Sequence, residues 1–165
     1  MYLKVYPDNP APRHIDQVTE TIKNGGLVIY PTDTVYAVGC DLYNTKAIEN
    51  LCKLVGKKPE EAKLSMIFSD LSTISDYTLP FDKGVFKAMK KSFPGPYTFI
   101  LNSSSKVPKI FKNKRKEIGV RIPNNLIPTK VVEALGSPMI SASLHDDDDI
   151  IQYPTDPEEI YEKYK

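Results

Sequence analysis

The chain has 165 residues, of which 41% are hydrophobic and 26% are charged, and its formal net charge is +1. This composition is typical of one globular domain, and no stretch approaches the ~18–20 consecutive apolar residues of a membrane span. Residues 1–8 lack a basic start followed by an apolar run, so we expect no signal peptide. The two cysteines, Cys40 and Cys52, are too few for a disulfide framework, and we expect reduced thiols in a cytoplasmic protein.

Helical and strand periodicities alternate along the chain. In order, they predict a helix over 14–24, a strand over 27–30 covered on both faces, a helix over 45–55, a strand over 65–68, a helix around 85–89, strands over 97–101 and 118–122, a helix over 128–135 and a strand over 138–143. A last helix should begin after Asp156, which can cap it, with Pro157 in its first turn. This alternation predicts one α/β domain around a twisted sheet.

Charge is distributed unevenly. Residues 83–121 hold eleven Lys and Arg against one acid, a net +10, whereas residues 144–165 hold eight acids against two lysines, a net −6. The basic stretch could attract a polyanion such as RNA, although such runs in soluble proteins are more often solvated surface. The aspartates at 146–149 are interpreted as a solvated loop, because adjacent carboxylates rarely converge on one ion. We predict no metal ligands.

Short polar side chains follow the predicted strand over 27–30. Thr32, Asp33, Thr34 and Tyr36 come directly after it. In open α/β sheets ligands bind beyond the carboxyl ends of strands, so the hydroxyls of this segment could hold a small polar substrate. Threonine and aspartate also close turns and cap helices, and the residues alone do not separate the two interpretations.

Four segments, in order, resemble the signatures of the YrdC-like family, the threonylcarbamoyl-AMP synthases and their relatives. They are 30–41 (YPTDTVYAVGCD), 93–101 (FPGPYTFIL), 118–123 (IGVRIP) and 137–143 (SPMISAS). The resemblance implies a single YrdC-type domain over 1–165. Its fold is expected to be a twisted, mostly open sheet flanked by helices, with a basic concave cavity.

The resemblance also implies a reaction. Family enzymes join L-threonine, bicarbonate and ATP, with Mg²⁺, into threonylcarbamoyl-AMP and pyrophosphate for the N6-threonylcarbamoyladenosine modification of tRNA. An alternative is a non-catalytic protein of the same fold that binds tRNA or double-stranded RNA, and a third possibility is an enzyme for another carboxylate or nucleotide. We expect neither a membrane nor DNA as a partner.

Site residues follow by position in the matched segments. Thr32, Thr34 and Tyr36 would line a threonine pocket, while Ser141 and Ser143 would contact the nucleotide. Arg121 and Lys58 would act in catalysis and bind phosphate, since an arginine fork pairs two phosphate oxygens. The alternative is that Arg121 forms an ion pair at the surface and has no role in binding or catalysis. RNA would be bound by the basic residues of the 112–116 stretch, namely Lys112, Lys114, Arg115 and Lys116.

Three departures from the family pattern point to its YciO-like branch. Gly56 stands at the family's lysine position, Lys58 at its arginine position and Ser143 at its asparagine position. Lysine keeps the charge but loses the bidentate geometry. Family members also continue with further strands and a Gly-Gly…Ser-Thr-Val segment. We therefore expect either that this sequence is a piece of a longer one or that part of the ATP site is absent.

Overall fold

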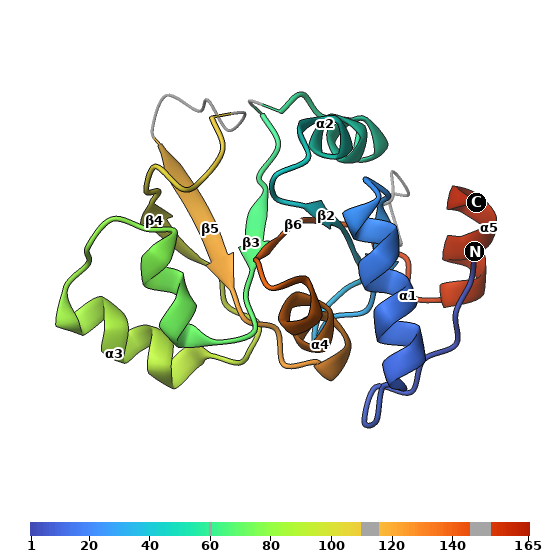
Figure 1. Cartoon of the computed structure of the whole chain (residues 1–165), viewed down its shortest axis with the longest axis horizontal. Helices are drawn as coiled ribbons and strands as arrows, with labels where there is room; N and C mark the ends of the chain where they lie inside the picture. The colour runs from blue at the N-terminus through green and yellow to red at the C-terminus, as the bar shows by residue number, and fades with distance from the viewer. Residues whose placement is uncertain (60, 110–115, 146–152) are drawn as a thin grey trace.

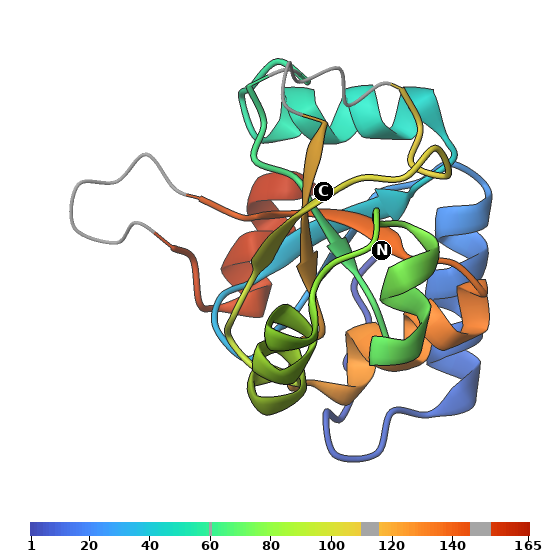
Figure 2. The ribbon, with the colours of Figure 1, turned by 90° about the vertical axis from the view of Figure 1, so that its left-hand side faces the viewer.

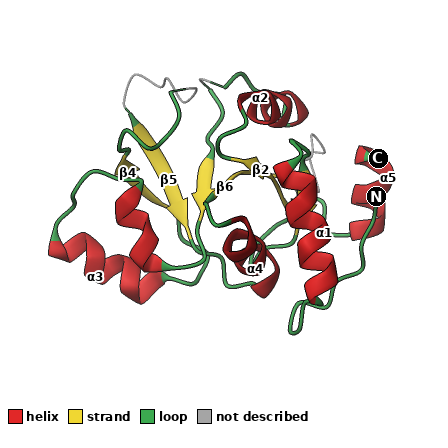
Figure 3. Cartoon of the chain, in the orientation of Figure 1, coloured by secondary structure: helices red, strands yellow, loops and turns green. Residues whose placement is uncertain are grey.

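A computed structural model describes residues 1–59, 61–109, 116–145 and 153–165 of the chain (Figure 1). Its helices are α1 (Pro12–Lys23), α2 (Thr45–Leu54), the 3₁₀ helix η1 (Leu71–Asp76), α3 (Lys83–Ser92), α4 (Leu126–Leu135) and α5 (Pro157–Tyr164). Its strands are β1 (Val28–Tyr30), β2 (Ala37–Asp41), β3 (Ser65–Ile67), β4 (Phe99–Asn102), β5 (Glu117–Arg121) and β6 (Met139–Ser143). Figure 3 distinguishes the two sets by colour.

Capping side chains set several helix boundaries. Asp156 accepts hydrogen bonds from the backbone N–H groups of Glu158 and Glu159, which confirms the predicted start of α5. Helix α4 begins two residues earlier than predicted, because the Asn125 side chain accepts from the backbone N–H of Ile127. The N-terminal segment lies beside α5, where the Tyr2 and Tyr161 rings are 5.6 Å apart (Figure 1).

The predicted α/β domain is confirmed, and its six described strands form one open, twisted sheet in the order β1-β2-β6-β3-β5-β4 (Figure 2). Only β3 and β5 pair in parallel, and the other neighbours are antiparallel. The sequence analysis predicted no strand at β2. The predicted strand over 27–30 is confirmed as β1, and both of its faces are covered, because Ile29 packs against one apolar cluster while Val28 and Tyr30 pack against another. It lies at an edge of the sheet, where Val28 and Ile29 are half-buried.

Alternate side chains of the strands enter two separate cores. Val38, Cys40, Met66 and Ile140 face the larger core, which also receives side chains of α2, α3 and α5. The side chains at the alternate positions pack on the other face, against α1 and α4, and include Ala37, Ile67 and Met139. The two faces of the central strands are therefore both apolar, as expected for a sheet covered by helices.

Part of the face that α1 and α4 cover stays open. A row of paired residues crosses four adjacent strands there, from Ser141 through Ser65 and Gly119 to Ile100. Ile100 is 62% exposed, so no helix covers the sheet at that point. Figure 1 shows β3 and β5 uncovered beside α4. We call this surface, over β3, β5 and β4, the open face.

Candidate functional site

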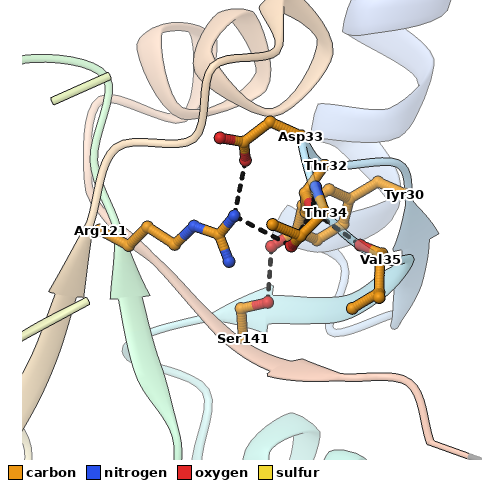
Figure 4. A network of polar contacts seen from close by, with 7 residues as sticks. All are labelled: Tyr30, Thr32, Asp33, Thr34, Val35, Arg121 and Ser141. Atoms are coloured by element: carbon orange, nitrogen blue, oxygen red, sulfur yellow. Dashed lines mark hydrogen bonds and ion pairs between the residues drawn. The ribbon is translucent and has the colours of Figure 1, made fainter. Parts of the chain in front are cut away.

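An enclosed ion pair joins β5 to the loop between β1 and β2 (Figure 4). Arg121 Nη2 lies 2.6 Å from Asp33 Oδ1 and donates a second hydrogen bond to Thr34 Oγ1 at 3.1 Å. The side chains of Arg121 and Asp33 are only 13% and 12% exposed. The alternative that Arg121 forms an exposed ion pair at the surface is therefore wrong.

The strand directions show how far these groups must reach. Arg121 ends β5 in the register row of Ile67, Met139 and Asp41, whereas loop 31–36 enters β2 at Ala37, four residues away along that strand. Four residues of extended strand span about 13 Å. The loop and the long arginine side chain together close this gap across the sheet.

Two threonine hydroxyls hold the loop in place. Thr32 Oγ1 donates to the carbonyl of Val35 at 2.7 Å and accepts from the backbone N–H of Thr34 at 3.0 Å. Because the single Thr32 proton is used in this way, the contact of 3.1 Å between the two hydroxyls must be donated by Thr34. Thr32 then has no free hydrogen-bonding capacity, while Thr34 keeps one lone pair.

Ser141 is held by a similar chain of hydroxyls. Its Oγ donates to the carbonyl of Val38 at 3.1 Å, so the 2.5 Å contact with Tyr30 is donated by the tyrosine. Ser141 is 3% exposed, and burial raises the pKa of Tyr30 above its ordinary value. To donate a hydrogen bond to a nucleotide, Ser141 would have to release the carbonyl of Val38.

The other predicted residues lie apart from the ion pair. The Tyr36 ring packs against the larger core, and burial, followed by the charges of Tyr2 and Asp156, raises its pKa. Lys58 is exposed after α2 and precedes β3, so it lies at the end of the sheet opposite Arg121. Ser143 is exposed at the end of β6. Lys116 is exposed, whereas Lys112, Lys114 and Arg115 fall outside the described residues, as do the aspartates at 146–149.

Sequence reasoning gave no role to two residues that the structure brings to this surface. Asp33 was seen only as one polar residue of its segment, and its pairing with a residue 88 positions away had no local signal. Ser65 presents a half-buried hydroxyl on the open face between Ser141 and Gly119. An ideal Cβ on Gly119 would lie 2.7 Å from Ser65 Oγ, so the glycine makes room for that hydroxyl.

A groove of about 670 Å³ lies beyond the carboxyl ends of β3 and β5. It is lined by Ser69 and Asp70 after β3, by residues 122–125 after β5, and by Lys90 and Phe93. None of the predicted site residues lines it. We place the candidate site at the ion pair and the open face, because enclosed charges and hydroxyls gather there.

Within the described ranges, no three His, Cys, Asp or Glu side chains come together in a way that could hold a metal ion. The carboxylate at the ion pair, Asp33, already contacts Arg121. The described residues therefore do not form a metal centre. No helix of the described chain is both long and apolar enough to cross a membrane.

Fold and site together define an α/β domain that carries an enclosed arginine–carboxylate pair at an uncovered sheet face. The chain belongs to the Sua5, YciO and YrdC family, whose model, described as telomere recombination, matches residues 20–165. This confirms the resemblance drawn from the four sequence segments.

Comparison with Escherichia coli YciO places the chain within this family. It is 40% identical to the uncharacterized protein YciO of Escherichia coli K12 over 144 residues, which are 87% of this chain and 69% of that protein. The crystal structure of E. coli YciO superposes with a TM-score of 0.87 over 96% of this chain and 76% of that one, at 39% identity. The YciO-like branch predicted from Gly56, Lys58 and Ser143 fits these values.

More distant relatives have a named activity. A threonylcarbamoyl-AMP synthase of Halorhodospira halophila is 28% identical over 137 residues, 83% of this chain and 71% of that protein. The structure of P. abyssi Sua5 complexed with L-threonine has the same fold, with a TM-score of 0.77 over 83% of this chain and 40% of that one, at 23% identity.

Proposed function

We propose that this chain joins L-threonine, bicarbonate and ATP into threonylcarbamoyl-AMP and pyrophosphate, for N6-threonylcarbamoyladenosine modification of tRNA. The observation that carries the proposal is the enclosed Arg121–Asp33 pair beside the open face. The synthases among its relatives support the reaction, and the L-threonine in the Sua5 complex makes threonine the first substrate to test.

The proposed chemistry needs a cation where Arg121 lies. The carbamate oxygen of N-carboxylated threonine attacks the α-phosphorus of ATP, and the bond from that phosphorus to pyrophosphate breaks. Two anions approach each other in this step, and fixed positive charge lowers its barrier. Arg121 Nη1 has no partner among the described residues and is not enclosed, so it is the guanidinium nitrogen that can meet an anion.

Lys58 is proposed to contact another part of the nucleotide. It precedes β3 while Arg121 ends the parallel strand β5, so the two cations flank the open face from opposite ends. Because the described residues hold no cluster of metal ligands, we propose that Mg²⁺ enters on the phosphates of ATP.

Pyrophosphate release from MgATP and bicarbonate, with and without L-threonine, tests this function. Threonine-dependent release is expected from the whole chain. Arg121→Lys keeps the charge but loses the fork, so it should lower this release, whereas the matched control Arg13→Lys, on the exposed surface of α1, should not. Absence of release beside an active control synthase would contradict the proposal.

RNA binding is a second candidate, favoured by the exposed lysines of α3. Lys83, Lys87, Lys90 and Lys91 are all exposed, and no ion pair joins them to another described residue. Double-stranded RNA and tRNA are bound largely through shape and phosphates, for which clustered lysines suffice. Binding should weaken steeply with salt. Neutralising these four lysines together should reduce that salt dependence, and unchanged binding would argue against this candidate. Neutralising Lys112, Lys114, Arg115 and Lys116 together tests the stretch predicted from the sequence separately.

A further inference from the structure

The contacts of Arg121 fix one edge of its guanidinium. Both contacts, with Asp33 Oδ1 at 2.6 Å and with Thr34 Oγ1 at 3.1 Å, use the same nitrogen, Nη2. Figure 4 shows the side chain extended toward the loop, with the other terminal nitrogen free of dashed lines. The guanidinium is therefore held from one side only.

The threonine that shares Nη2 is itself oriented. Thr34 donates its proton to Thr32, whose proton is committed to the carbonyl of Val35. The oxygen of Thr34 is thereby left as an acceptor for Arg121. The hydrogen bonds run in one direction, from the guanidinium through both threonines to the backbone of the loop.

The ion pair contains only one of the two hydrogen bonds that a guanidinium and a carboxylate can form. Asp33 Oδ2 and Arg121 Nε are both enclosed, and neither has a hydrogen-bond partner in the part of the chain that the structure describes. These two atoms are the acceptor and donor that a bidentate arginine–carboxylate pair would join. Since Thr34 holds Nη2 as well, the guanidinium stays short of the bidentate arrangement.

We propose that Asp33 is a positioning residue, which with Thr34 holds Arg121 across the sheet so that Nη1 faces an anionic ligand. The inference rests on the proposed function for the identity of that ligand, the phosphates of ATP. Asp33 does not touch the reacting atoms. It fixes the orientation of the Arg121 guanidinium, which contacts them. A misplaced catalytic group lowers kcat far more than it weakens substrate binding.

Asp33→Asn tests this role, because asparagine keeps the shape of the side chain and removes its charge. The matched control is Asp41→Asn, which makes the same change in a half-buried carboxylate on β2 that contacts Tyr43 instead of Arg121. We expect kcat for pyrophosphate release to fall on the order of 10- to 100-fold in Asp33→Asn, with KM for ATP changed less than about twofold. Unchanged kcat, or a rise in KM alone, would overturn the proposal.

Nuclear magnetic resonance of the arginine side chains tests the positioning without any reaction. The sequence has three arginines, so their Nε–H signals are easily assigned, and exposed Arg13 is an internal reference. We expect slow rotation of the Arg121 guanidinium in the wild type and free rotation in Asp33→Asn. Free rotation already in the wild type would overturn the proposal, and this arm stays valid if the wild type releases no pyrophosphate.

A second pair of variants, at Thr34, tests the same proposal independently in case Asp33→Asn fails to fold. Thr34→Val removes the other acceptor of Nη2 and should also free the rotation, while Thr34→Ser keeps the hydroxyl and should restore it. Inorganic pyrophosphate, added as a probe, should shift the Arg121 signals in the wild type and in Thr34→Ser. Identical rotation in valine and serine variants would show that Thr34 does not hold the guanidinium.

Discussion

Tyr30 and Ser141 share one hydrogen bond, but removing the hydroxyl of Ser141 should destabilise the fold more than removing the hydroxyl of Tyr30. Ser141→Ala leaves the buried Tyr30 hydroxyl, 2.5 Å away, without its acceptor, and an unsatisfied buried donor costs about 1–3 kcal/mol. Tyr30→Phe removes the donor itself and leaves Ser141 bonded to the carbonyl of Val38, so it should cost only about 0.5–1.5 kcal/mol.

The double variant gives the decisive comparison. With both hydroxyls gone no donor is orphaned, so Tyr30→Phe/Ser141→Ala should be about as stable as Ser141→Ala or more so, a coupling of roughly 1 kcal/mol. Urea unfolding followed by far-ultraviolet circular dichroism measures all four proteins. Costs that simply add, or a Ser141→Ala no less stable than Tyr30→Phe, would refute the direction assigned to this bond.

Alkaline pH provides an independent check on Tyr30. Burial raises the pKa of its phenol, an effect that the hydrogen bond to Ser141 opposes. Because the folded pKa exceeds the unfolded one, the stability is intact below about pH 10 and falls above it by up to ~1.4 kcal/mol per pH unit. Tyr30→Phe cannot ionise and should lose stability less steeply there. Equal slopes would contradict the burial of this hydroxyl.

Three further predictions concern packing. Burial raises the pKa of the Cys40 thiol to about 12, so at about pH 8 iodoacetamide should label Cys40 only in unfolded protein, as mass spectrometry can show. Gly119→Ala should destabilise by crowding Ser65 Oγ, and adding Ser65→Ala should recover part of the loss in urea unfolding. Gly136→Ala has open space but a φ of +73°, so it should cost about 1 kcal/mol, and Ser65→Ala should not recover it.

Helices were predicted well where their signals are local. Asp156 and Pro157 mark the start of α5 within a few residues, and Gly136, with its positive φ, ends α4. Strand β2 was not predicted, because Ala37, Gly39 and Cys40 have weak strand propensity. Their burial comes from pairing with β1 and β6 and from the helices that cover both faces of the strand.

The candidate site was predicted in part. Arg121, Thr34 and Thr32 were chosen from matched segments, and the structure brings them into one hydrogen-bonded group. Asp33 stands between those threonines in the sequence and was given no role. Its partner lies 88 residues away, and nothing in the spacing of either segment indicates the contact.

The sequence by itself determined the α/β class, most of the helices and strands, and the family, because these depend on periodicity, caps and short motifs within a few residues. Only the tertiary structure decided the strand order, the open face and the direction of the hydroxyl chains. Those features arise when burial of two apolar faces brings together segments that are far apart in the chain. The polar groups buried with them then form hydrogen bonds with whichever polar groups lie close enough. The pairing of Asp33 with Arg121 is one such outcome.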